Sequence, residues 1–157
     1  MADDVMFGFD PGEIDTSAPT RSARLKWVIV VDDALSVGRQ SNAVACVAAA
    51  TQAGVSGLLG PDAVDADGAR HPGLPWAGCT ILGAGTERMT TVLARASTRP
   101  EVFVADMAGA AQETRVYDEY LETVGRTPSS ELGVRAVSLV GPRKAVDKII
   151  GGLSLLA

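Results

Sequence analysis

Five polar residues gather after the end of an expected buried strand and in the first turn of the helix expected next: Asp33, Ser36, Arg39, Ser41 and Asn42. Open α/β sheets bind ligands beyond the carboxyl ends of their strands, and the free amides at a helix start attract anions. Arg39 offers a planar fork for a carboxylate or phosphate, and Asn42 offers both a donor and an acceptor. The segment predicts a ligand site over residues 33–42. The alternative is that Ser36 or Ser41 only caps the helix.

His71 is the single histidine of the chain and a candidate for proton transfer. An imidazole titrates near neutral pH and acts as a general base when a water or nucleophile and an orienting group lie beside it. Asp65 and Asp67 are the nearby carboxylates that could orient it. The alternative is an exposed or loop-bracing histidine, because one histidine by itself defines no reaction.

Residues that hold metals and nucleotides in other proteins lack the required spacing here. Cys46 and Cys79 lie far apart in the sequence, so no zinc site is expected, and both are interpreted as small buried apolar side chains. The turn Gly83-Ala-Gly85 lacks the third glycine and the later acidic residue of a dinucleotide-binding fingerprint. We therefore expect neither a metal nor a cofactor.

A second polar group falls on an expected helix over residues 112–124. Gln112 and Arg115 have the spacing of neighbours on one helix face, as do Glu113 and Tyr117, and Tyr120 follows within a turn. A ligand pocket, a solvated face and a contact between two copies of the chain explain this pattern equally well.

Runs of β-branched residues predict the strands, and alanine-rich or amphipathic segments predict the helices. The expected strands cover residues 26–32, 79–82, 101–105 and 134–140, and the expected helices cover 39–53, 86–97, 112–124 and 143–150. Because strands and helices alternate, the sequence predicts an α/β domain with three layers, α/β/α, in which the middle layer is a mixed, largely parallel four-stranded sheet. The turn-rich segment 54–77 predicts a surface excursion with a short hairpin at residues 65–68.

Composition divides the chain into an acidic N-terminal arm, residues 1–23, and one domain, residues 24–157. The arm lacks apolar periodicity, so we expect it to be flexible or loosely docked, and residues 1 to about 20 to be dispensable for folding. Residues 1–15 hold five acids and no base, which leaves fourteen acids against fourteen Lys and Arg in the rest of the chain. A neutral domain carries no basic footprint for nucleic acid, so tRNA is not an expected partner.

The apolar segments are short and the first residues are acidic. No segment approaches the roughly 20 apolar residues that span a bilayer, so no membrane partner is expected. The start Met-Ala-Asp-Asp has neither the basic nor the apolar region of a secretory signal, which predicts a cytoplasmic location.

The segment from Lys26 to Cys46 resembles the opening of the type II peptidyl-tRNA hydrolases, in which a hydrophobic strand runs into a Leu-Lys-Met-Gly-Lys-Gly-Lys loop and an alanine-rich helix. Residues 137–156 resemble the closing strand, Gly-Pro turn, helix and Gly-x-Leu tail of the same enzymes. Asp106 matches an aspartate that follows another strand of that family. Ser36 and Ser41 stand where the hydrolases have lysines. The resemblance implies their fold, without efficient hydrolysis of peptidyl-tRNA.

The chain bears a closer resemblance to the bacterial family known as domain of unknown function 2000. This resemblance rests on Arg24-Leu-Lys-Trp27, Asn42-Ala43, the loop 65–71, Gln112-Glu-Thr-Arg115 with Tyr117 and Tyr120, and residues 141–156. It implies the same fold and no settled activity.

Two functions follow from these patterns. The first is a small hydrolase or acyl-transfer enzyme acting on a small acyl or amide substrate, in which Asn42 and Arg39 hold a carbonyl or carboxylate and Asp106 or His71 moves a proton. The second is a non-catalytic protein that binds a small molecule in the same cleft, or an accessory protein that forms a homodimer. Gln112 is the residue of the 112–124 segment that we assign to ligand binding under either hypothesis.

Overall fold

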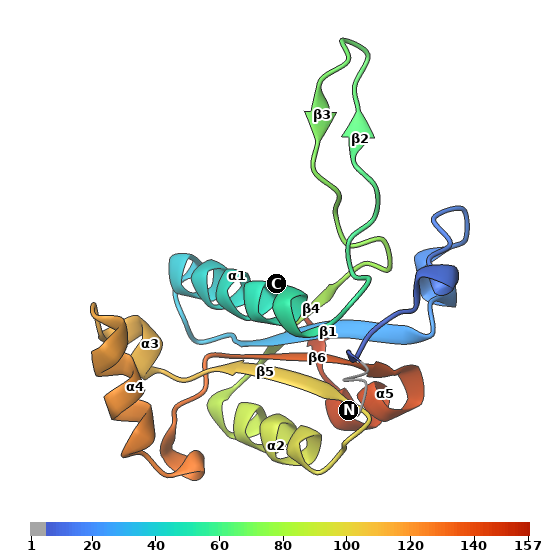
Figure 1. Cartoon of the computed structure of the whole chain (residues 1–157). Coiled ribbons are helices and arrows are strands. Elements are labelled where there is room, and N and C mark those ends of the chain that lie inside the picture. Colours follow the sequence, from blue (N-terminus) through green and yellow to red (C-terminus); the bar gives the residue numbers. More distant parts are fainter. Residues whose placement is uncertain (1–5) are drawn as a thin grey trace, which may run out of the picture.

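Five strands form one mixed sheet in the computed structural model, which describes residues 6–157 (Figure 1). They lie in the order β5-β6-β1-β4-β7. Their bounds are Leu25–Asp32 for β1, Thr80–Ala84 for β4, Phe103–Met107 for β5, Ala136–Pro142 for β6 and Ser154–Leu155 for β7. The expected mixed α/β class is confirmed, but the prediction of four strands was wrong. The two residues of β7 are too few to show a hydrophobic period in the sequence.

The strand directions also differ from the largely parallel sheet that was expected. Within the described residues only β1 and β4 run parallel, whereas the β1–β6, β5–β6 and β4–β7 pairs are antiparallel. Met107 at the end of β5 lies opposite Ala136, where β6 begins. The chain therefore re-enters the sheet at the end that it left, and the direction must reverse. Alternation of strands and helices does not distinguish this return from a crossover.

Helices cover both faces of the sheet. α1 (Val37–Gly54) lies on one face, and α2 (Thr86–Ser97) and α5 (Arg143–Ile150) lie on the other (Figure 1). All three lie where the sequence predicted helices. No helix of the described chain has the length and apolar character needed to cross a membrane.

The helix expected over residues 112–124 is broken into α3 (Ala110–Glu113) and α4 (Tyr117–Gly125). Thr114 and Val116 between them are extended, with φ and ψ of −103° and 156° for Thr114 and of −116° and 128° for Val116. Both side chains are β-branched, which favours extended backbone over helix. The Thr114 hydroxyl also donates to the Ala110 carbonyl at 2.9 Å. The break lets residues 114–117 line a cavity.

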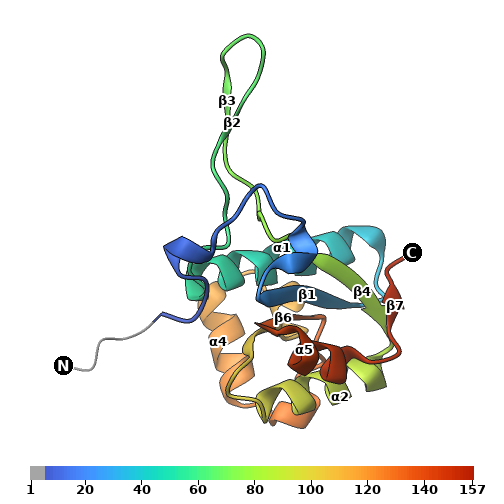
Figure 2. The same ribbon diagram turned by 90° about the vertical axis from the view of Figure 1, so that its right-hand side faces the viewer.

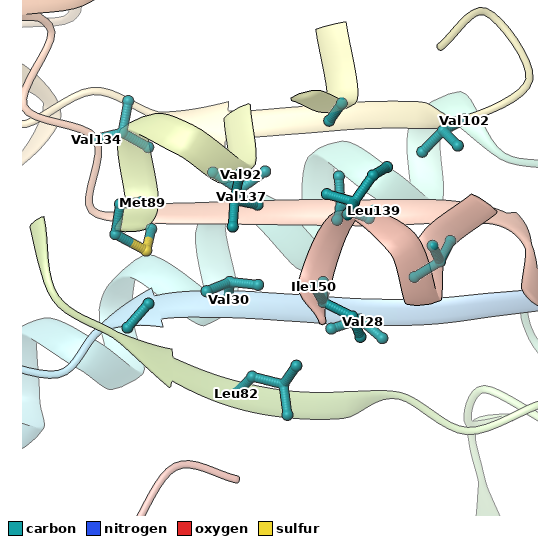
Figure 3. Packing of buried hydrophobic residues seen from close by; sticks show 14 of the residues in the cluster. Val28, Val30, Leu82, Met89, Val92, Val102, Val134, Val137, Leu139 and Ile150 are labelled. Atoms are coloured by element: carbon teal, nitrogen blue, oxygen red, sulfur yellow. The ribbon is translucent and has the colours of Figure 1, made fainter. Parts of the chain in front are cut away.

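The sheet divides the core into two layers. Val28, Val30, Val137 and Leu139 face α2 and α5, and Figure 3 shows them around side chains of those helices. Trp27, Ile29 and Val31 belong to the layer on the α1 side. Because β1 is buried on both faces, its sequence shows no polar alternation. In the α1 layer the indole of Trp27 is paired, since its Nε1 donates to Ser138 Oγ at 2.9 Å.

The described part of the N-terminal arm, residues 6–23, is attached to the domain. Phe9 is only 4% exposed, and its ring lies 4.9 Å from the ring of Trp76. Glu13 forms an ion pair with Arg24, whose hydrogen bond lowers the pKa of the Glu13 carboxyl to about 2. The composition predicted a flexible or loosely docked arm, and the burial of Phe9 shows that residues 6–23 are docked on the domain.

Residues 61–72 project from the domain as a hairpin (Figure 1, Figure 2). The short hairpin expected here is present, since β2 (Ala63–Val64) pairs with β3 (Arg70–His71). Asp65 Oδ1 accepts the amides of Asp67 and Ala69 at 2.9 and 3.0 Å and so fixes the turn. Gly68 has a φ of +86°, which other residues rarely adopt.

Candidate functional site

A cavity of about 590 Å³ opens beside β5, between α1 and the α3–α4 segment. Small-molecule sites commonly measure about 300–1,000 Å³ and combine apolar walls with a few polar groups. This cavity has that composition: its lining residues are Asn42, Cys46, Val47, Ala49, Ala50, Asp106, Met107, Ala111, Thr114, Arg115, Val116, Tyr117 and Tyr120.

One wall of the cavity is a face of α1. Asn42, Cys46 and Ala49 follow one another at intervals of three or four residues, so they lie on one side of the helix. Ala43 and Thr51, which do not line the cavity, are fully buried in the domain. The alanines project so little from the helix that space remains between α1 and α4.

Asp106 supplies a carboxyl group from β5, the edge strand of the sheet. Its neighbour Met107 is buried in the core, whereas Asp106 lies on the exposed side of the strand and lines the cavity. The surrounding walls withdraw water from the carboxyl, and this desolvation raises its pKa above the ordinary value of 3.8. Asp106 is thus easier to protonate than a free aspartate.

Two tyrosines of α4 form the opposite wall. The rings of Tyr117 and Tyr120 lie 5.3 Å apart at a tilt of 55°. Burial raises the pKa of Tyr120, and the charges that Tyr117 and Asp106 can carry raise it further. Tyr120 therefore remains a neutral phenol that can donate a hydrogen bond in the cavity.

Arg115 brings a positive charge to the cavity. It lies in the link between α3 and α4, and it forms no ion pair within the part of the chain that the structure describes. Its guanidinium can therefore bind a carboxylate or phosphate through two parallel hydrogen bonds.

The structure brings three of the expected site residues together and separates the others. Asn42 and Asp106 line the cavity, and Gln112 Nε2 donates to Asn42 Oδ1 at 3.2 Å. Gln112 also donates to the backbone carbonyl of Arg39 at 2.9 Å. The cavity therefore lies beside the body of α1, not beside the loop that precedes it.

The remaining residues of the 33–42 segment do not line this cavity: they are Asp33, Ser36, Arg39 and Ser41. Ser36 occupies the N-cap position of α1, but its side chain makes no capping hydrogen bond. The segment is exposed at these four positions. The ligand site expected over residues 33–42 therefore stays a prediction, and of its five polar residues only Asn42 lines the cavity.

His71 lies on the projecting hairpin and not in the cavity. Its Nε2 is 3.1 Å from Asp65 Oδ2, and this contact is the main reason that the pKa of Asp65 is lowered. The expected pairing of His71 with Asp65 is present, but it braces an exposed turn. The expectation that His71 joins Asp106 and Asn42 in one catalytic site is therefore corrected.

Sequence reasoning missed a charged cluster under α3. Asp32, the last residue of β1, is 3% exposed, and its Oδ2 lies 3.9 Å from Arg135 Nη1. Arg135 Nη2 lies 3.3 Å from Glu113 Oε1, so the guanidinium connects the sheet to α3. The signal in the sequence was a charge at the end of each of two buried strands, at Asp32 and just before Ala136.

The cysteines do not behave as expected, since both Cys46 and Cys79 are exposed. Cys46 lines the cavity because the face of α1 that carries it turns away from the sheet. The described residues contain no cluster of three or more His, Cys, Asp or Glu side chains that could hold a metal ion.

These features define a mixed α/β protein with helices on both faces of one sheet and a cavity at the sheet edge. The chain belongs to the family described as protein of unknown function, DUF2000, whose model matches residues 25–157. The protein of unknown function Atu0240 from Agrobacterium tumefaciens strain C58 has a similar structure, with a TM-score of 0.80 and 19% identity. The match covers 85% of this chain and 98% of that chain, and it shows the fold alone. No curated protein matches the chain.

Proposed function

We propose that this protein binds a small molecule that has an apolar, preferably aromatic, body and a carboxylate. The observation that carries the proposal is the cavity of about 590 Å³, in which alanines and tyrosines surround a few polar groups. Cavities of this size and composition are the usual sites of small ligands.

Each part of the ligand has a matching wall. An aromatic ring can stack on the Tyr117–Tyr120 pair, because offset and tilted ring contacts are favourable. Arg115 supplies the charge for the carboxylate. Asn42 and the phenol of Tyr120 offer hydrogen bonds that orient the molecule.

The proposal is tested by filling the cavity. We would titrate the protein by calorimetry with a set of arylacetic acids and with the corresponding primary amides. Ala49→Phe places a ring in the space beside α1, whereas Ala45→Phe places the same ring at an exposed position of α1 outside the cavity. We expect the acids to bind the wild type and Ala45→Phe but not Ala49→Phe, and to bind more tightly than the amides.

Two results would contradict the proposal. Undiminished binding by Ala49→Phe would place the ligand elsewhere. If no acid bound the wild type, or if acids and amides bound equally, Arg115 would not bind a carboxylate. The proposed class of ligand would then be wrong.

A second candidate function is hydrolysis or acyl transfer on a small acyl or amide substrate. The observation in its favour is the raised pKa of Asp106, because a general base works best when its pKa approaches the working pH. Asp106 would take a proton from the water that attacks the carbonyl carbon, and the side-chain amide of Asn42 would donate to the carbonyl oxygen. The proton would then pass to the leaving group.

This second function is tested with 4-nitrophenyl acetate and with simple arylacetamides. Asp106→Asn should abolish turnover and retain binding of an arylacetic acid, while His71→Ala should leave turnover unchanged. If Asp106→Asn turned over as fast as the wild type, Asp106 would not be the base.

We also propose that the fold is that of the type II peptidyl-tRNA hydrolases and that tRNA is not a substrate. The support for the second statement is the exposed segment 33–42, where Arg39 is the single basic residue and serines stand at the positions of two hydrolase lysines. Phosphate contacts dominate the affinity of nucleic-acid complexes. In a filter assay, any tRNA binding should therefore disappear at physiological salt, and salt-tolerant binding would contradict the proposal.

A further inference from the structure

A second cleft, of about 260 Å³, lies at the other end of the sheet from the cavity. Its walls come from the N-terminal arm, the beginnings of β1 and β4, and the first residue of α5. The lining includes Thr20, Arg21, Lys26, Cys79, Thr80 and Arg143. Thr20 and Arg21 lie outside the residues that match the family model.

Three cations line this small cleft, and they differ in how far other groups already engage them. Lys26 Nζ lies 2.7 Å from Asp147 Oδ1. Arg143 donates from Nε and Nη2 to two backbone carbonyls of the arm at 3.0 and 3.2 Å, which leaves its other N–H groups available. Arg21 is exposed and has no ion pair within the described chain.

The charges do not cancel at this place. When Asp147 is set against the three lining cations, the four side chains carry a net charge of plus two, although the whole chain has a formal charge of −5. No Asp or Glu lines the cleft in the described part of the chain. Cys79 is exposed as a residue, but its thiol lies in the cleft, where desolvation raises its pKa to about 12, so this group is neutral and does not repel an anion.

The cleft has the size and the neutral donors that a small anion requires. Gly78 has a φ of +75°, and a Cβ at this position would lie 4.0 Å from the Cβ of Thr20, so the turn passes close to the arm. Thr20 and Thr80 contribute hydroxyl groups to the lining. Since a water occupies about 30 Å³ in the liquid, the volume accommodates an anion of several heavy atoms.

We propose that this cleft binds a phosphate group, either as inorganic phosphate or as the end of a phosphomonoester. The net charge of plus two matches a dianion. Arginine forks and hydroxyl donors are the groups that recognise phosphate oxygens. Arg143 holds the arm in place and forms the base of the site, and Arg21 contributes affinity without a structural contact of its own.

Calorimetry with the full chain tests this site, with inorganic phosphate and phenyl phosphate as probes at pH 7.5 and with ionic strength held constant by chloride. One hydrogen bond to a charged group contributes about 1.5–3 kcal/mol, so Arg21→Ala should weaken phosphate binding about tenfold or more. Arg95→Ala removes an exposed arginine from α2, far from the cleft in sequence, and changes the net charge equally. This control should bind phosphate like the wild type.

Further variants make the result decisive. Arg21→Glu should abolish binding while the melting temperature stays within a few degrees of the wild type, and Ala49→Phe should leave phosphate binding unchanged because it fills a different cavity. Tighter binding of phenyl phosphate would identify a phosphomonoester, and equal binding would identify the free ion. The proposal is overturned if the wild type binds neither probe at 10 mM (on the order of the weakest useful affinity), or if Arg21→Ala and Arg95→Ala weaken binding equally.

Discussion

Gln112 and Asn42 are joined by a hydrogen bond of 3.2 Å between their side chains, although 70 positions separate them in the sequence. The same Gln112 amide donates to the Arg39 carbonyl, so one side chain connects α3 to the first turns of α1 beside the cavity. Its Oε1 is buried and has no hydrogen-bond partner in the described chain. Such an oxygen costs stability, so the contact is better explained by the fixed orientation of Asn42 than by a gain in stability.

The first prediction concerns this contact. Gln112→Met keeps the length of the side chain and removes both hydrogen bonds together with the unpartnered oxygen. We expect stability to change by less than about 1 kcal/mol, because the two effects oppose each other. Affinity for an arylacetic acid should fall about fivefold, since Asn42 loses its orientation and one hydrogen bond contributes about 1 kcal/mol. Calorimetry measures this affinity, with Ser41→Ala as the control. Equal affinities for the two variants would show that Asn42 does not need the hydrogen bond from Gln112.

The second prediction follows from the raised pKa of Asp106. In the folded protein Asp106 keeps its proton to a higher pH than in the unfolded chain, so between these two pKa values the folded state binds more protons. The free energy of unfolding therefore falls as the pH rises from about 3.8 through the pKa of the folded state. Asp106→Asn has no such titration.

Thermal melts at two pH values test whether the free energy of unfolding falls as the pH rises. At pH 7 Asp106→Asn should melt at a higher temperature than the wild type, and at pH 3 the difference should become smaller or disappear. A variant that melts lower than the wild type at pH 7 and equally at pH 3 would show that the carboxylate stabilises the fold, opposite to the prediction.

The local elements could be predicted from the sequence because their signals are local. The run from Trp27 to Val31 is buried on both faces, and Thr86–Ser97 and Arg143–Ile150 have the spacing of helices that cover a sheet. The antiparallel return of β6 and the two-residue β7 depend on where the chain re-enters the sheet, which no local pattern records.

The candidate site was predictable only in part for the same reason. Asn42 and Asp106, which were both named from the sequence, line the cavity. The cavity itself exists because the helix is interrupted at Thr114 and Val116 and because small alanine side chains of α1 line it. His71 was favoured by its chemistry alone. Without the fold, the sequence could not show whether His71 and Asp106 lie close together.

The third prediction concerns the N-terminal arm. Phe9 is 4% exposed and packs on Trp76, so Phe9→Ala should lower the free energy of unfolding by about 3 kcal/mol, the lower part of the usual range for a buried phenylalanine. Met6→Ala changes a residue that is 61% exposed and should have no measurable effect. Urea denaturation compares the two. Equal stability of both variants would support the expectation that residues 1 to about 20 are dispensable for folding.

The fourth prediction concerns the charged cluster beneath α3. Arg135→Ala leaves the buried carboxylate of Asp32 without its cation, which should cost about 2 kcal/mol of stability, less than the 3–5 kcal/mol of a tight buried pair because the ions are 3.9 Å apart. Glu113→Ala breaks the other contact of Arg135, but the Glu113 side chain is 62% exposed, so the loss should stay within about 0.5 kcal/mol. Chemical denaturation distinguishes the two, and equal losses would mean that Asp32 does not depend on Arg135.

The last prediction separates two arginines that could bind a carboxylate. The sequence favoured Arg39, because it lies at the start of a helix after a buried strand. In the structure, however, the backbone carbonyl of Arg39 accepts a hydrogen bond from Gln112, and Arg39 does not line the cavity, whereas Arg115 does.

Arg39→Ala retains the carbonyl, so this variant should bind an arylacetic acid like the wild type. Arg115→Ala should weaken that acid by about 1.5–3 kcal/mol, the scale of a hydrogen bond to a charged group, and should leave binding of the matching amide unchanged. Both arginines are exposed, so neither variant should alter stability by more than about 0.5 kcal/mol. The reverse result, with the acid weakened by Arg39→Ala and not by Arg115→Ala, would move the site back to the loop that precedes α1.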